Sequence, residues 1–208
     1  MQRNDRVRTL TYMALFAAIS TLLMYIEMPL PFLPPFLKLD ISGAPILLAA
    51  FLFGPWQAVG ITLVKDLVHL LSTQTGGVGE LADFLMLASF ALLCGYLYRY
   101  VHNRKGALIS LSVGTVILVA VGALSNWFLL IPFYSKIMPI EAIVGACQAI
   151  NKNINSIAAY IWVGVVPFNL IKGVVISLLT FLLYKRLSGL VHRQPKAAPT
   201  RIDKSRQV

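Results

Sequence analysis

The chain has 208 residues, of which 58% are hydrophobic and only 12% are charged, and its formal net charge at pH 7 is +10. A soluble domain carries roughly 25% charged residues, so this composition excludes a protein with a water-soluble surface and predicts an integral membrane protein.

Apolar runs long enough to cross a bilayer occur four times in the sequence. A helix that crosses ~30 Å of hydrocarbon needs about 20 apolar residues. Runs of this kind predict four spanning helices, and two shorter runs joined by Gly54-Pro55 predict a hairpin-like pair. The expected fold is an all-α integral membrane domain of six transmembrane helices in residues 1–187, followed by a basic tail, 188–208, that we expect to be disordered. The six runs are 9–26, 41–53, 56–71, 82–98, 107–131 and 160–184.

Basic residues predict the orientation of the chain in the membrane. Thirteen of the 18 lie in three clusters that flank apolar runs, which is typical of cytoplasmic loops. We therefore expect both termini and the loop between the fourth and fifth spans to be cytoplasmic, and we expect no nucleic-acid partner. The clusters are Arg3, Arg6 and Arg8; Arg99, Arg104 and Lys105; and Lys185, Arg186, Arg193, Lys196, Arg201, Lys204 and Arg206.

Ala14 and Ala18 form a small-xxx-small pattern in the first span. Small residues four apart allow another helix to approach closely in lipid. The pattern alone fits either packing within this chain or contact with a partner subunit.

Three connecting segments differ from ordinary spans. Four prolines in residues 28–38 exclude a helix and favour a stiff extended loop. Residues 72–79 predict a flexible polar turn. In residues 133–159 a stripe of apolar residues recurs at steps of three and four, which predicts an amphipathic helix on the outer membrane surface. The stripe is Ile140, Ile143, Cys147, Ile150, Ile154 and Ile157.

Acidic residues stand at the start of the fourth span. Glu80 follows the glycine-rich turn, and Asp83 comes one turn later. Acids at a helix start interact favourably with the helix dipole, so both fit a capping role, while Glu80 fits a ligand contact equally well. Lys65 and Asp66, in the short third segment, are candidates for pairing across helices.

Polar residues within the long spans are the strongest indication of a site. An ionised side chain at mid-bilayer costs about 2.5–3.5 kcal/mol on insertion scales, so Lys172 indicates a functional site. Asn169 lies three residues earlier, on the same helix face. Together they suit a ligand edge that carries carbonyls and ring nitrogens. Asn126 lies beside Trp127 and Phe128, where a buried amide and aromatic rings would suit a flat ligand, although Trp127 fits an aromatic belt at the membrane interface as well.

Common catalytic and metal-binding motifs are absent from the sequence. There is no GK dipeptide and hence no P-loop, so we expect no ATP hydrolysis by this chain. HExxH, GxSxG and paired histidines are also missing, and Cys94 and Cys147 show no redox or metal spacing. We predict no catalytic residue, no metal site and no cofactor.

Five motifs together resemble a known transporter family. The chain is similar to the S components of energy-coupling-factor (ECF) transporters, and specifically to the riboflavin-specific ones, from residue 8 to residue 185. The motifs are PFLPPFLKLDIS at 31–42, FGPWQAVG at 53–60, GGVGEL at 76–81, SNWFLLIPFY at 125–134 and PFNLIKG at 167–173.

The resemblance implies a six-helix subunit of a prokaryotic cell membrane that binds riboflavin as transported ligand near its extracellular side. Asn126, Asn169 and Lys172 would contact the isoalloxazine ring, and Glu80 would lie where the ribityl chain is held. The proline-rich loop that ends at Leu39 and Asp40 would cover the pocket, with Leu39 beside the ring.

The resemblance also implies partners. Through Ala14 and Ala18 the first helix would contact a membrane scaffold subunit, which couples S components to two ATP-binding subunits. The alternatives are an S component for another vitamin, such as pantothenate or a thiamine precursor, a standalone secondary transporter, and a membrane-embedded enzyme. A secondary transporter usually carries inverted repeats and more intramembrane charge than this chain.

Overall fold

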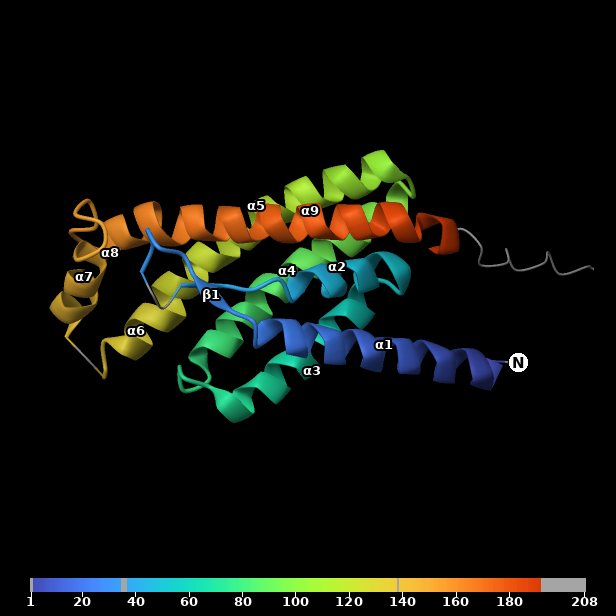
Figure 1. Ribbon diagram of the computed structural model, residues 1–208, viewed down its shortest axis with the longest axis horizontal. Coiled ribbons are helices and arrows are strands. Elements are labelled where there is room, and N and C mark those ends of the chain that lie inside the picture. The colour runs from blue at the N-terminus through green and yellow to red at the C-terminus, as the bar shows by residue number, and fades with distance from the viewer. Residues whose placement is uncertain (1, 35–36, 138, 192–208) are drawn as a thin grey trace, which may run out of the picture.

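The computed structural model describes residues 2–34, 37–137 and 139–191 and shows an elongated helical bundle (Figure 1). The longer helices run roughly along its long axis, and α6, α7 and α8 gather at the end opposite the N-terminus. The helices are α1 (Gln2–Met24), α2 (Gly43–Leu52), α3 (Pro55–His69), α4 (Val78–Tyr100), α5 (Arg104–Ser125), α6 (Ile131–Tyr134), α7 (Ile140–Gln148), α8 (Ile157–Ala159) and α9 (Val166–Val191). A 3-10 turn, η1 (Leu70–Ser72), follows α3.

Four helical stretches in the described part of the chain are long and apolar enough to cross a membrane: Val7–Met24, Val78–Tyr100, Arg104–Tyr134 and Ile157–Arg186. They confirm the four long spans predicted from the sequence, with ends that differ by a few residues. The two shorter predicted segments correspond to α2 and α3. Since α9 extends to Val191 and residues 192–208 lie outside the described residues, the predicted disordered tail stays a prediction.

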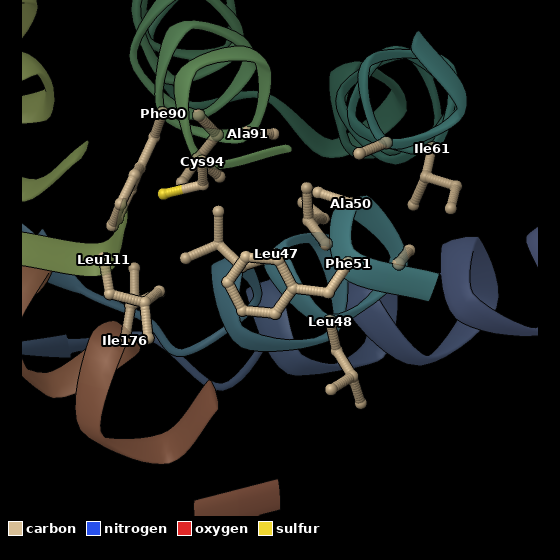
Figure 2. Packing of buried hydrophobic residues seen from close by; sticks show 14 of the residues in the cluster. Leu47, Leu48, Ala50, Phe51, Ile61, Phe90, Ala91, Cys94, Leu111 and Ile176 are labelled. Carbon is tan, nitrogen blue, oxygen red and sulfur yellow. The ribbon is translucent and has the colours of Figure 1, made fainter. Parts of the chain in front are cut away.

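The short helix α2 is enclosed by the rest of the bundle. Nine of its ten residues are buried, and α1, α3, α4 and α9 all contact it. A Cβ atom on Gly43 would lie 2.8 Å from Ile176 and 2.9 Å from Leu87, so the helix start depends on the absence of a side chain. In Figure 2, Leu47 and Phe51 of α2 point into the core beside Cys94. Protein rather than lipid therefore surrounds this helix.

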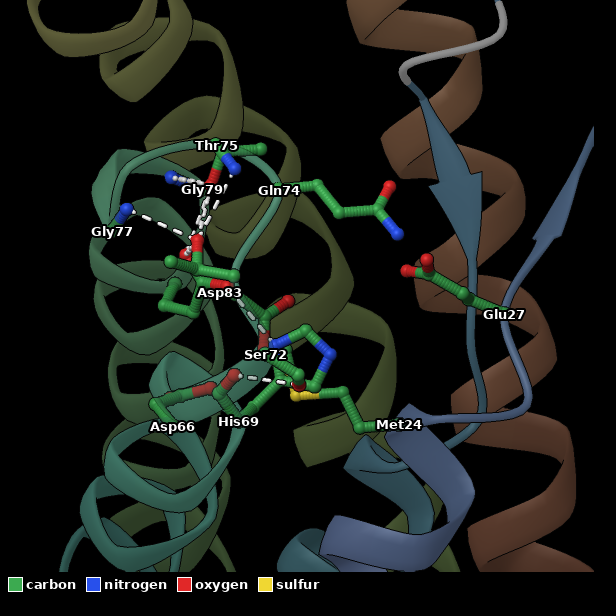
Figure 3. Close-up of polar contacts among 12 residues, drawn as sticks. Met24, Glu27, Asp66, His69, Ser72, Gln74, Thr75, Gly77, Gly79 and Asp83 are labelled. Atoms are coloured by element: carbon green, nitrogen blue, oxygen red, sulfur yellow. Dashed lines mark hydrogen bonds and ion pairs between the residues drawn. The ribbon is translucent and has the colours of Figure 1, made fainter.

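The described residues of the proline-rich loop form no helix, as predicted, but they contain a short pairing that the sequence did not reveal. Strands β1 (Met28–Pro29) and β2 (Lys38–Leu39) pair antiparallel, with Met28 opposite Leu39. Lys38 also forms an ion pair with Glu27 and donates to the Gln74 side chain at 3.2 Å. In Figure 3, the side chains of Glu27 and Gln74 lie on facing segments. Lys38 thus links the loop both to the segment that follows α1 and to the turn before α4.

Of the apolar stripe that predicted an amphipathic helix, only the part from Ile140 to Gln148 is helical, as α7, and the position of α7 on the membrane surface stays a prediction. Beyond it, the Asn151 side chain accepts a hydrogen bond from the backbone N–H of Asn153 at 3.0 Å. Such local side-chain bonds compete with helical ones, which explains the interruption.

Two π-helical segments interrupt the long spans at facing positions. They are η2 (Asn126–Leu130), between α5 and α6, and η3 (Tyr160–Val165), between α8 and α9. The two segments contact each other. Because π-helical turns are frequent at functional sites, this pair marks a region to search for a site.

Candidate functional site: a cavity with a charged floor

A cavity of about 380 Å³ lies among β2, α4, η2, α7 and α9, towards the end of the bundle away from the N-terminus. Ligand pockets typically measure about 300–1,000 Å³ and combine apolar walls with a few polar groups. The apolar wall includes Leu37, Met86, Leu130, Ile131, Ile143 and Phe168. The polar groups include Lys38, Thr75, Asp83, Asn126, Tyr160, Asn169 and Lys172.

Asn169 presents a buried amide to this cavity. The residue is 1% exposed, and no described residue forms a hydrogen bond to its Oδ1 atom. A Cβ atom on Gly122 of α5 would lie 2.4 Å from Asn169 Nδ2, so a glycine is needed for the amide to fit against α5. A buried polar atom without a partner is unfavourable, which points to a ligand group as the missing partner.

Lys172, one turn further along α9, lines the same cavity and is held by two carboxylates. Its Nζ atom donates to Asp40 Oδ2 and to Asp83 Oδ1, both at 2.8 Å. Asp40 is itself fixed by Ser42, whose backbone N–H donates to Oδ1 at 2.9 Å and whose hydroxyl donates to the same oxygen. The sequence indicated a functional site at this lysine, and the structure shows that two acids already hold its ammonium group.

Asp83 continues this charged contact towards α3, which corrects its assignment as a helix-capping residue. Its Oδ2 atom accepts from Lys65 Nζ at 2.5 Å, and Lys65 lies 2.7 Å from Asp66. Lys65 also contacts the sulfur of Met24 at 3.2 Å. The pairing across helices suggested for Lys65 therefore connects it to α4.

Glu80 lies next to the cavity but does not line it. It accepts hydrogen bonds from the hydroxyls of Thr73 and Thr75, each at 2.9 Å, and contacts His69 Nδ1 at 3.0 Å. Thr75 lines the cavity, and its hydroxyl also accepts from the backbone N–H of Gly79 at 3.1 Å (Figure 3). Glu80 thus orders the polar turn that forms one end of the cavity.

Asn126 lies on the cavity wall at the start of η2. Its Nδ2 atom donates to the backbone oxygen of Gly122 at 2.9 Å, and Tyr160 of η3 donates its hydroxyl to Asn126 Oδ1 at 2.9 Å. The Asn126 amide is therefore fixed in one orientation by the two interrupted helices. Sequence reasoning missed Tyr160, because a tyrosine at the end of a span is also the usual anchor at a membrane interface.

Part of the proline-rich loop lines the cavity, as the resemblance implies, while contact of Leu39 with the ring stays a prediction. Leu37 and Lys38 line the cavity, whereas Leu39 packs with the apolar residues around Ile131. Asp40 lies beneath the wall, bonded to Lys172.

Ala14 and Ala18 are exposed on α1, and Ala17 between them is buried. Ala14 and Ala18 therefore face away from the bundle. They form a strip of small side chains on α1 that allows another helix to approach closely.

Comparison with known proteins shows which family this chain resembles in sequence. The family described as "ECF transporter, substrate-specific component" matches residues 8–184. The riboflavin transporter RibU of Staphylococcus aureus is 37% identical, over 93% of this chain and 95% of that protein. The riboflavin transporter FmnP of Bacillus subtilis is 26% identical, over 92% of this chain and 98% of that protein.

A solved structure agrees with these relatives. The S component of a bacterial ECF transporter aligns with a TM-score of 0.72 and 34% sequence identity, over 90% of this chain and 99% of that one. With its four apolar helices, this chain is a multi-pass membrane protein. The chain belongs to the family of substrate-specific S components of ECF transporters.

Proposed function

We propose that this chain binds riboflavin in the cavity and delivers it for ATP-driven uptake. The observation that carries the proposal is the unpartnered Oδ1 atom of Asn169 beside Asn126 and Lys172. The flavin ring has a flat edge on which an N–H lies between two carbonyls. An amide oxygen can accept from that N–H, while amide and ammonium N–H groups donate to the carbonyls.

The charged residues at the floor of the cavity, Asp40, Asp83 and Lys172, favour riboflavin over an anionic vitamin such as pantothenate. Lys172 already faces the carboxylates of Asp40 and Asp83, so its positive charge is compensated within the protein. A ligand carboxylate at this place would meet two buried acids, whereas a neutral ring accepts one hydrogen bond without adding charge.

We infer six membrane crossings, formed by α1, α2, α3, α4, the α5–α6 helix and the α8–α9 helix, with no catalytic role for the chain. Basic residues lie at the end of the bundle that contains the N-terminus, which supports cytoplasmic termini. The cavity then opens towards the outside of a prokaryotic cell membrane, and α7 lies at the outer surface beside it.

Purified protein in detergent is expected to bind riboflavin without any partner. Titration should quench flavin fluorescence to a stoichiometry near one, because Asn126, Asn169 and Lys172 all line the same cavity. Pantothenate in excess should not compete. Lack of quenching, or an ATPase activity that copurifies with the isolated chain, would contradict the proposal.

The proposed partners are an ECF membrane scaffold subunit and two ATP-binding subunits, with α1 as the contact helix. Ala14→Leu together with Ala18→Leu should abolish copurification with the scaffold, because leucines fill the strip that allows close helix approach. Riboflavin affinity should stay within about twofold, a free-energy change well below 1.4 kcal/mol. Ala120→Leu, at an exposed position of α5, is the matched control and should leave assembly intact. Retained assembly with weakened binding would instead assign the strip to packing within this chain.

A further inference from the structure

Asp83 lines the cavity and occupies a central position among the charged residues at its floor. It lies on α4, is 8% exposed, and uses its two carboxylate oxygens for two different lysines. Oδ1 accepts from Lys172 on α9 at 2.8 Å, and Oδ2 accepts from Lys65 on α3 at 2.5 Å. The same carboxylate thus holds a lysine of the cavity wall and a lysine that lies outside the wall.

The contacts of Lys172 determine what it can offer to a ligand. An ammonium group has three N–H donors and no acceptor. Two of the donors are engaged by Asp40 and Asp83, and the residue lines the cavity. One donor is left for a ligand, and its direction is fixed because the other two are bonded to buried, tightly held carboxylates.

The charges beneath the cavity form a chain that alternates in sign. In order of contact it is Asp40, Lys172, Asp83, Lys65 and Asp66, with successive N–O distances between 2.5 and 2.8 Å. Three carboxylates face two ammonium groups, and all five residues are less than 9% exposed. The cation at the cavity is therefore fully compensated before any ligand arrives, and charge interactions in such a buried place are weakly screened.

We propose that Asp83 is a positioning and specificity-determining residue, which fixes Lys172 so that it donates one hydrogen bond and which makes the cavity select a neutral ring edge over an anionic one. This inference rests on the proposed function, riboflavin binding. Asp83 acts through Lys172 and is not itself proposed to bond to the ring.

The two redox states of riboflavin provide ligands of nearly the same shape and different charge. The oxidised ring is neutral, whereas the two-electron reduced ring loses a proton beside its carbonyl edge and is an anion at mildly alkaline pH. Asp83 should therefore make the reduced form bind more weakly than the oxidised one. Bound riboflavin in the unaltered protein should show a lower midpoint potential than free riboflavin.

The test is the midpoint potential and the affinity of riboflavin on detergent-purified Asp83→Asn, with dithionite as the reductant under anaerobic conditions. Asparagine keeps the shape but removes one negative charge from the floor. The affinity for oxidised riboflavin should fall about tenfold, because Lys172 loses a fixed partner. The ratio of reduced to oxidised affinity should rise by about tenfold, which raises the midpoint potential by about 30 mV relative to the unaltered protein.

Two further variants separate positioning from other roles. Asp66→Asn makes the same isosteric change at the far end of the chain of charges, where the carboxylate contacts Lys65 and not Lys172. Its shift in potential should be clearly smaller. Asp40→Asn removes the other carboxylate on Lys172 and should raise the potential as Asp83→Asn does, so it provides the test if Asp83→Asn does not fold.

The possible results distinguish a failure of the proposed function from a failure of the role given to Asp83. If the unaltered protein binds no riboflavin, the proposed function fails. If riboflavin binds and Asp83→Asn loses affinity at an unchanged potential, Asp83 is only structural and the inference is overturned. Equal shifts of the midpoint potential in Asp83→Asn and Asp66→Asn would also overturn it. They would mean that the potential depends on the total charge of the region and not on the contact between Asp83 and Lys172.

Discussion

Lys172→Met is expected to weaken riboflavin binding and also to destabilise the empty protein. Loss of the donor to the ring leaves a buried carbonyl without a partner, which costs about 1–3 kcal/mol, or roughly 5- to 150-fold in affinity. Loss of the ammonium also leaves Asp40 and Asp83 buried without their shared cation. Breaking a buried ion pair in this way typically costs about 3–5 kcal/mol of stability.

The two effects can be separated by a second substitution. Lys172→Met combined with Asp40→Asn removes one of the acids that the lysine compensated, so the melting temperature should recover in part. Riboflavin affinity should not recover, because the donor is still missing. A thermal unfolding series and a fluorescence titration measure the two quantities on the same samples. Unchanged affinity in Lys172→Met would remove this residue from the site and leave it a purely structural cation.

Gly122→Ala should disrupt the site from a helix that supplies no ligand contact at that position. The added Cβ atom would lie 2.4 Å from Asn169 Nδ2 and 2.8 Å from its Cγ atom, so the buried amide must move. Displacement of the amide loses its hydrogen bond to the ring, with an expected affinity loss of about 1–3 kcal/mol. The fluorescence titration measures this loss directly.

Gly145→Ala is the matched control for Gly122→Ala. Gly145 lies on α7, and a Cβ atom there would meet no atom within 4 Å. Affinity should stay unchanged in this variant, although the chemical change is identical. Equal losses in both variants would mean that the amide of Asn169 is not the affected group.

The long spans and the family were predictable because both depend on local sequence. A lysine in an apolar span is costly, so Lys172 was conspicuous, and Asn169 shares its face because the two are three residues apart. The structure places both on the cavity wall, while their contact with riboflavin stays a prediction. The resemblance carried by the short motifs is confirmed by the family match over residues 8–184.

Contacts between distant segments were not predictable from patterns. Asp83 was explained as a helix-start acid, yet its partners lie 18 and 89 residues away, on Lys65 and Lys172. The apolar stripe continues to Ile157, whereas α7 ends at Gln148 and is followed by a turn in which the Asn151 side chain accepts from the backbone N–H of Asn153. No sequence pattern indicated that Tyr160, 34 residues from Asn126, would donate its hydroxyl to the Asn126 side chain.

The enclosure of α2 has a consequence for how the protein adapts to different membranes. Long apolar spans respond to bilayer thickness by tilting or by deforming the lipid around them. Since nine of the ten residues of α2 are covered by neighbouring helices, lipid exerts little direct force on it. Asp40 and Ser42 immediately precede this helix and belong to the charged floor. We therefore expect the part of the floor that Asp40 forms to respond less to bilayer thickness than the parts carried by α3, α4 and α9.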